Sequence, residues 1–289
     1  MTRLSRPWFW PLGWGGAYLG SVLATRTWLP PAGTRAESLA ALLVLGPLVW
    51  TAVLAVNDRH DLPSDRRNPR KATAPLVSGA LTVADLTRWY AGSVLAALAV
   101  AAMAGPAFLT GTALVLLLGH LYSAPPVRLK ARPGADVAVN ALVVGVLGPL
   151  AGWSLHRPVG AYPLVLAVLG LLLAAALYLP TTVLDADADR FAGDATSAVR
   201  WRPVTCYRAG LLLWTSATAL WLVCCHLGML VERDSWWLQT ATAPALILGY
   251  AAGTRRPTIA RMAVIVVAFA VPAGDFLLAC VTVPVSVLP

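Results

Sequence analysis

The feature that most constrains this chain is a series of hydrophobic segments, each about as long as a membrane is thick. A hydrocarbon core of about 30 Å needs roughly 20 apolar residues in a helix. A mean hydropathy of +0.70 and a charged fraction of 12% exclude an ordinary soluble domain. We therefore predict an all-α integral membrane protein, a bundle of about nine transmembrane helices that forms one domain over residues 1–289. The segments lie at 10–26, 38–56, 86–104, 107–123, 136–154, 160–184, 205–229, 237–253 and 261–281.

The lysine and arginine residues fall almost entirely on alternate loops between these segments. Eighteen of the 22 lie on the side that holds the N-terminus, and the remaining four are Arg26, Arg35, Arg157 and Arg233. By the positive-inside rule, this asymmetry predicts a cytoplasmic N-terminus in a multi-pass protein of the cell membrane. The formal charge of +9 is thus explained by topology, and we expect no nucleic-acid partner.

The acidic residues gather on the same predicted side, which is unusual in a chain with so few charges. Nine of the 13 lie there, and most of these nine form two clusters. The first cluster, NDRHDLPSD at 57–65, follows the second hydrophobic segment. The second cluster, DADADRFAGD at 185–194, follows the sixth segment. A shared feature at two distant places in the chain indicates a common purpose.

Helical spacing would place the side chains of each cluster on one face. If the helices continue past the membrane, residues three or four apart are neighbours on their surface. Carboxylates at such spacing repel each other near a low-dielectric membrane unless cations neutralise them. Mg²⁺ does so while sharing its other positions with water and phosphate oxygens. The alternative for each cluster is a solvated loop in which the acids pair with nearby arginines, but two matched clusters on one side favour metal binding. The residues at this spacing are Asn57, Asp58, Asp61 and Asp65 in the first cluster, and Asp185 and Asp189 in the second.

Together these motifs resemble the UbiA superfamily of intramembrane prenyltransferases. The first cluster matches the signature NDxxDxxxD, and Asp185 with Asp189 matches DxxxD. A third stretch, YSAPPVRLK at 122–130, looks most like the chlorophyll synthase branch. PLVSGALT at 75–82 and GADVAVNALVVGVLGPLAGW at 134–153 also resemble family segments, so that the resemblance covers most of the chain.

The resemblance implies a central cavity with the two aspartate motifs facing each other at its cytoplasmic mouth. Mg²⁺ would hold a prenyl diphosphate there, while the isoprenoid tail lies in the apolar cavity. Tyr122 would lie near the allylic cation, which an aromatic face stabilises. The implied catalytic residues are Asp58, Asp61, Asp185, Asp189 and Tyr122. The implied metal ligands are Asn57, Asp58, Asp61, Asp65, Asp185 and Asp189, and the implied diphosphate-binding residues are Asn57, Arg70, Lys71, Arg128 and Lys130.

We expect from this a Mg²⁺-dependent transfer of an isoprenoid group from a prenyl diphosphate to an aromatic or other ring-bearing acceptor. The first alternative is a terpene cyclase of the same superfamily, which would convert a C15 or C20 diphosphate without an acceptor. A second alternative, from a different class, is a transporter or an inactive scaffold. The acids of both motifs are intact, which argues against the second alternative.

Four further polar residues in or beside the hydrophobic segments are candidates for a role in the site. Asp136 and Asn140 are spaced i, i+4 at the start of the fifth segment, where they could position a substrate or cap a helix. His120, two residues before Tyr122, could accept a proton or could be a packing residue. Asp275 is ionisable and lies within the ninth segment, but about 21 Å from its cytoplasmic end at 1.5 Å per residue. We therefore do not expect Asp275 to act in catalysis.

Overall fold

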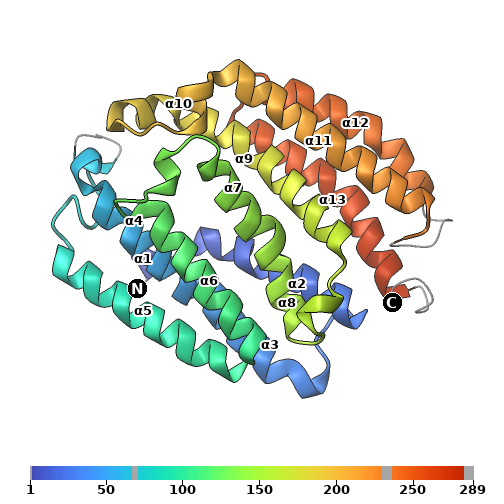
Figure 1. Ribbon diagram of the computed structural model, residues 1–289, viewed down its shortest axis with the longest axis horizontal. Helices are drawn as coiled ribbons and strands as arrows, with labels where there is room; N and C mark the ends of the chain where they lie inside the picture. Colours follow the sequence, from blue (N-terminus) through green and yellow to red (C-terminus); the bar gives the residue numbers. More distant parts are fainter. Residues whose placement is uncertain (1, 67–70, 230–235, 283–289) are drawn as a thin grey trace.

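The computed structural model describes residues 2–66, 71–229 and 236–282, and the regular elements in these ranges are helical (Figure 1). The α-helices are α1 (Thr2–Ser5), α2 (Trp10–Thr25), α3 (Arg35–Leu43), α4 (Val49–Asp65), α5 (Val83–Met103), α6 (Pro106–Ser123), α7 (Ala135–Leu142), α8 (Gly148–Ser154), α9 (Leu164–Ala192), α10 (Ser197–Trp201), α11 (Pro203–His226), α12 (Trp236–Thr254) and α13 (Ile259–Thr282).

All nine predicted hydrophobic segments are largely helical, and seven helical stretches are long and apolar enough to cross a membrane. The other two segments are α2 and α12. α2 has 16 residues, which is short for a full crossing, and α12 contains Gln239 and several threonines that lower its hydropathy. Nine crossings and a cytoplasmic N-terminus therefore stay predictions. The seven stretches are Ala32–Asp65, Val83–Met103, Pro106–Ser123, Ala135–Ser154, Leu164–Ala192, Pro203–His226 and Ile259–Thr282.

The helices form two groups with a central layer between them. Figure 1 shows α4, α5 and α6 on one side, α9, α11, α12 and α13 on the other, and α2, α7 and α8 in the middle. Small residues allow the central helices to approach closely. A Cβ on Gly20 would clash with the Pro149 carbonyl, and one on Gly152 would clash with the Ala17 carbonyl. As in other membrane bundles, packing against small residues brings the backbones together.

Two turns of π-helix interrupt segments that the sequence predicted as continuous α-helix. One, Val44–Leu48, joins α3 to α4, and the other, Val143–Leu147, joins α7 to α8. Each wider turn shifts the register of the residues that follow it by one position. The helical faces of α4 and α8 therefore cannot be extrapolated from the start of their segments.

α9 remains continuous over 29 residues although it contains Pro180. A proline lacks the N–H that would bond the carbonyl four residues earlier, which here belongs to Ala176. The Tyr250 hydroxyl on α12 donates to this carbonyl at 2.6 Å. A side chain from a neighbouring helix thus satisfies the group that Pro180 leaves free.

Both acid motifs, 57–65 and Asp185 with Asp189, lie on helices that extend beyond their predicted hydrophobic segments, as expected. α4 continues to Asp65 and α9 to Ala192, so each motif is helical from its first acid to its last. The end of α4 and the end of α9 with α10 lie at the same end of the bundle (Figure 1). The loop between α6 and α7 runs between them and carries Arg128 and Lys130.

Candidate active site at the ends of α4 and α9

Lys130 holds the centre of the first motif. Its Nζ donates to Asn57 Oδ1 at 2.8 Å and to both carboxylate oxygens of Asp61, at 2.6 and 2.5 Å. The side chains of Lys130 and Asp61 are only 12% and 15% exposed, so water screens the pair weakly. Ser123, which follows Tyr122, donates a longer hydrogen bond of 3.4 Å to Asn57. Three predicted site residues from two distant segments therefore meet at one point.

The other two acids of the first motif each contact a different base. Arg6 donates through one nitrogen, Nη2, to both oxygens of Asp58, at 2.8 and 3.0 Å, in a charge-assisted ion pair. Lys71 Nζ lies 3.2 Å from Asp65. From the sequence, Arg6 served only to predict the topology. The signal that could have identified it as a site residue was its place just before Pro7, on the same predicted side of the membrane as the first motif. Arg70, another predicted diphosphate ligand, lies outside the described residues.

In the second motif, the structure separates the three aspartates by exposure and partner. Asp189 accepts a hydrogen bond from Thr196 at 2.9 Å. Asp187 points away: its side chain is 99% exposed and pairs with Arg190. Asp185 is exposed, so the selection of Asp185 and Asp189 over Asp187 by the DxxxD spacing stays a prediction.

Arg128 connects the two motifs. It donates to Asp61 on α4 at 3.1 Å and, through Nε and Nη2, to Asp194 just beyond α9 at 3.0 to 3.1 Å. Burial alone would lower the pKa of Arg128, but Asp194 and Asp61 outweigh it and raise the pKa, so the guanidinium stays charged. Its backbone has a φ of 40°, in the left-handed region that non-glycine residues seldom occupy. Such strained positions cluster at functional sites.

Tyr122 is held by side chains from two other helices. Its hydroxyl lies 2.7 Å from the Tyr178 hydroxyl on α9 and accepts a hydrogen bond from Asn140 Nδ2 on α7 at 3.0 Å. Tyr178 was not among the residues predicted from the sequence. It lies seven residues before Asp185, nearly two helical turns, so both side chains project from the same face of α9.

Asp136, the neighbour of Asn140 on α7, has a structural role. It is 1% exposed and accepts hydrogen bonds from the backbone N–H of Ser197 at 2.8 Å and from the Ser197 hydroxyl at 2.5 Å. Ser197 is the first residue of α10, so Asp136 caps a helix distant in sequence. It also accepts a hydrogen bond of 2.9 Å from the Val137 N–H in the first turn of its own helix, α7. Of the pair Asp136 and Asn140, only Asn140 contacts a predicted site residue.

His120 and Asp275 both have partners away from the aspartate motifs. His120 Nδ1 lies 3.1 Å from the Tyr90 hydroxyl on α5, which is the packing role considered above. Asp275 accepts a hydrogen bond from Gln239 on α12 at 2.8 Å. It lies in the half of α13 that follows Pro272, while the acids of the site lie at the ends of α4 and α9.

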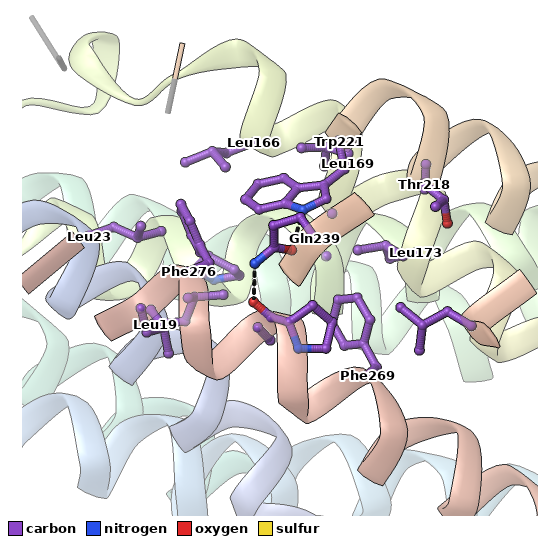
Figure 2. Close-up of a pocket in the computed structure, with 18 of the residues that line it drawn as sticks. Leu19, Leu23, Leu166, Leu169, Leu173, Thr218, Trp221, Gln239, Phe269 and Phe276 are labelled. Carbon is purple, nitrogen blue, oxygen red and sulfur yellow. Dashed lines mark hydrogen bonds between the residues drawn. The ribbon is translucent and has the colours of Figure 1, made fainter. Parts of the chain in front are cut away.

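An apolar cavity of about 180 Å³ lies among α2, α8, α9, α11, α12 and α13. Figure 2 shows its aromatic walls and Gln239, whose amide oxygen accepts from Trp221 at 2.7 Å and whose nitrogen donates to the Pro272 carbonyl at 3.0 Å. Because the protein already satisfies this amide, the cavity presents an almost entirely apolar surface to a ligand. Leu173, at the edge nearest the acids, precedes Asp185 on α9 by about 18 Å along the helix axis.

The two motifs offer donors that suit a hard divalent cation. All the predicted ligands supply carboxylate or amide oxygen, which Mg²⁺ prefers. Among the described residues, no three His, Cys, Asp or Glu side chains converge closely enough to form a metal cage. Mg²⁺ does not need one, since it is commonly held by one or two carboxylates together with water and substrate phosphate. Carboxylates at the same end of two helices would therefore suit Mg²⁺, which would supply positive charge to a diphosphate.

Comparison with known proteins identifies the architecture. Residues 13–271 match the model of the UbiA prenyltransferase family. A UbiA homologue from Archaeoglobus fulgidus, solved with GPP and Mg²⁺, aligns with a TM-score of 0.75 at 24% identity, covering 98% of this chain and 99% of that one. A structure from work on digeranylgeranylglyceryl phosphate synthase in membranes gives 0.75 at 15% identity, covering 98% of each chain.

A third solved structure, a UbiA homologue from Aeropyrum pernix K1 without ligand, aligns with a TM-score of 0.69 at 20% identity. The alignment covers 93% of this chain and 98% of that one. A search of curated protein sequences gave no match. These structural likenesses establish a shared fold.

Proposed function

Because the chain belongs to the UbiA prenyltransferase family, we propose that it transfers an isoprenoid group from a prenyl diphosphate to an aromatic or other ring-bearing acceptor within the membrane. The observation that carries this proposal is the pairing of Arg128 with Asp61 on α4 and with Asp194 just beyond α9, with Lys130 beside it on Asp61. The stretch 122–130, with its likeness to the chlorophyll synthase branch, supports a ring-bearing acceptor. We propose that residues 1–289 act as one catalytic unit.

The proposed binding mode uses acids for the metal and bases for the diphosphate. Carboxylates of both motifs, with Asn57, would hold Mg²⁺. Arg128 and Lys130 already lie among these carboxylates and would turn their N–H groups to the diphosphate oxygens, with Lys71 and Arg70 as further candidates. Arg6 likewise pairs with an acid of the first motif, Asp58, and we add it to the proposed diphosphate-binding residues. The metal ligands are Asn57, Asp58, Asp61, Asp65, Asp185 and Asp189.

In the proposed reaction, the bond between C1 of the prenyl group and the diphosphate oxygen breaks, and the diphosphate leaves with the electron pair. A bound divalent cation would supply positive charge against the leaving group. Lys130 and Arg128 add preorganised N–H donors to the same charge. Tyr122 faces the allylic cation with its aromatic ring. The acceptor then bonds to C1, and the proton that it loses passes to the departing diphosphate.

The experiment that tests this function separates transfer from cyclisation. Purified protein in lipid vesicles is incubated with Mg²⁺ and labelled geranyl, farnesyl or geranylgeranyl diphosphate, with and without a panel of ring-bearing acceptors. Transfer predicts a prenylated acceptor and diphosphate release that depends on the acceptor. A cyclic hydrocarbon or alcohol, formed at a rate that no acceptor improves, would instead establish the terpene cyclase. Failure to consume any of the three diphosphates would refute both.

The position of the apolar cavity predicts a preference for long prenyl chains. An extended isoprene unit adds four carbon–carbon bonds, or about 5 Å. With C1 near Tyr178, a two-unit chain reaches only the edge of the cavity at Leu173, about 7.5 Å away along α9, and a four-unit chain reaches through it to Leu166, about 18 Å away. We expect Thr218→Phe, which fills the cavity, to lower kcat/KM for geranylgeranyl diphosphate by at least about tenfold through steric conflict, with geranyl diphosphate unaffected. Ser216→Phe, on the exposed side of the same helix, is the control. Equal losses for both chain lengths would contradict the proposed tail site.

We propose that the site opens to the cytoplasm across the plasma membrane, on the basis of the arginine and lysine asymmetry. Single cysteines at Ser64 and Ala195, made after the four native cysteines are replaced, should resist an impermeant thiol reagent added outside intact cells. A cysteine at Ala161, exposed at the opposite end of α9, should react. Labelling of the first two positions with protection of the third would invert the proposed topology.

A further inference from the structure

A chain of hydrogen bonds links three side chains from three helices directly below the aspartate motifs. Asn140 on α7 donates to the Tyr122 hydroxyl on α6, which lies 2.7 Å from the Tyr178 hydroxyl on α9. Asn140 Nδ2 also donates to the Asp136 carbonyl at 2.9 Å. Both hydrogens of this amide are therefore committed, and its orientation is fixed.

The number of polar hydrogens in this network shows how many remain to bond a substrate. Asn140 brings one hydrogen to Tyr122, and each phenol brings one of its own. The two hydrogen bonds use two of these three hydrogens, whichever phenol donates to the other. Within the described residues, neither hydroxyl has a further partner. One phenol O–H thus remains free. The Tyr122 oxygen, which lies between Asn140 and Tyr178, cannot rotate away.

The network also lies between the two motif-bearing helices. On the side of α4, Ser123 follows Tyr122 and donates to Asn57. On the side of α9, Tyr178 precedes Asp185 by seven residues on the same face, about 10 Å deeper along the axis. This interval is about the length of a carboxylate-bound metal and diphosphate, so C1 of the prenyl group would lie near the two phenols.

We propose that Tyr178 is a positioning residue that holds the Tyr122 ring against the allylic carbon. This inference rests on the proposed prenyl transfer. A phenol held from both sides by Asn140 and Tyr178 keeps its aromatic face toward the cation without rotating, so no reorganisation is needed when charge develops. Tyr178 forms no bond to the substrate and acts through Tyr122.

The same arrangement protects the cation from water. When the C1–O bond breaks and the diphosphate leaves with the electron pair, water that reaches C1 bonds to it, loses a proton to a second water and yields a prenyl alcohol. A ring fixed over C1 excludes that water. The fraction of prenyl alcohol among the products therefore reports how well Tyr122 is held.

The test is a double-mutant cycle with Tyr122→Phe, Tyr178→Phe and the variant that carries both. For Tyr178→Phe we expect kcat to fall about tenfold, the scale of one lost hydrogen bond to a reacting group. The KM for the prenyl diphosphate should change little, and the alcohol fraction should rise. Because Tyr178 acts through Tyr122, the double variant should match Tyr122→Phe alone to within about twofold.

The matched control is Tyr250→Phe. It removes another buried phenol that bonds to α9, at Ala176, but from the side of α12. We expect it to lower the melting temperature and to leave kcat and the alcohol fraction unchanged. The positioning role is refuted if Tyr178→Phe behaves like this control. It is also refuted if the fall in kcat of the double variant equals the product of the falls in the two single variants. If the wild-type protein consumes no prenyl diphosphate, the proposed function itself fails.

Discussion

Asp61→Asn is expected to lower the rate of prenyl diphosphate turnover by at least about a hundredfold, the scale of losing a group that organises charge at a reacting centre. Asp61 lies where the site converges: it accepts from Lys130 through both oxygens and from Arg128 through one. Asparagine keeps the size and one acceptor oxygen but removes the charge. A cation ligand would be lost, and Lys130 would be left largely buried without its carboxylate partner, while Arg128 would keep Asp194.

The control for this substitution lies within the second motif. Asp187→Asn removes a carboxylate that is 99% exposed and pairs only with Arg190, so turnover should stay near that of the wild type. Asp185→Asn, two residues earlier, should behave like Asp61→Asn. The measurement is the initial rate of diphosphate release. Circular dichroism of the same samples then separates loss of activity from loss of fold. Near wild-type rates in both Asp61→Asn and Asp185→Asn would contradict the proposed metal and diphosphate site.

Removal of divalent cations should abolish activity altogether. The two motifs place five carboxylates at the same end of the bundle, and the bases that now contact Asp58, Asp61 and Asp65 are groups proposed to bind diphosphate. Without a metal, the trianionic diphosphate would meet these acids directly, and like-charge repulsion would oppose binding. We therefore expect EDTA to eliminate turnover and excess Mg²⁺ to restore it fully.

The informative measurement is a Mg²⁺ titration of the wild type beside the Asp65→Asn variant. Asp65 is paired with Lys71 at the edge of the motif, so its loss should raise the Mg²⁺ concentration needed for half-maximal rate more than it lowers the maximal rate. Ca²⁺ is the comparison ion, because its longer bonds and looser geometry suit a compact diphosphate complex less well. Undiminished turnover in chelator would mean that the acids serve another purpose.

The sequence by itself determined the helices and the location of the two acid motifs. Segment length and hydropathy are local properties, and a helix relates residues three or four apart by fixed geometry. The prediction that α4 continues to Asp65 was therefore correct before any tertiary contact was known. The selection of Asp185 and Asp189 over Asp187 by the DxxxD spacing stays a prediction. The family match over residues 13–271 follows from the same ordered motifs.

Local spacing could not show two features of the helices themselves. The π-helical turns at Val44–Leu48 and Val143–Leu147 shift the register within segments that look uniform in hydropathy. Pro180 would ordinarily suggest a break in α9, and only Tyr250, 70 residues later in the sequence, satisfies the carbonyl that it frees. In both cases the backbone responds to neighbours that the segment does not contain.

Only the tertiary structure decided which side chains meet. Arg6 pairs with Asp58 across 52 positions in the chain, and Tyr122 meets Tyr178 across 56. Asp136, whose spacing left open substrate positioning or a helix cap, caps α10 because folding places Ser197 beside it. Such contacts depend on how whole helices pack against one another, which the small residues between α2 and α8 and along α9 help to set. The sequence thus predicts which groups carry the chemistry, and the packing of the helices decided their partners. Hydrogen bonds and ion pairs require distances of a few ångströms that no local periodicity encodes.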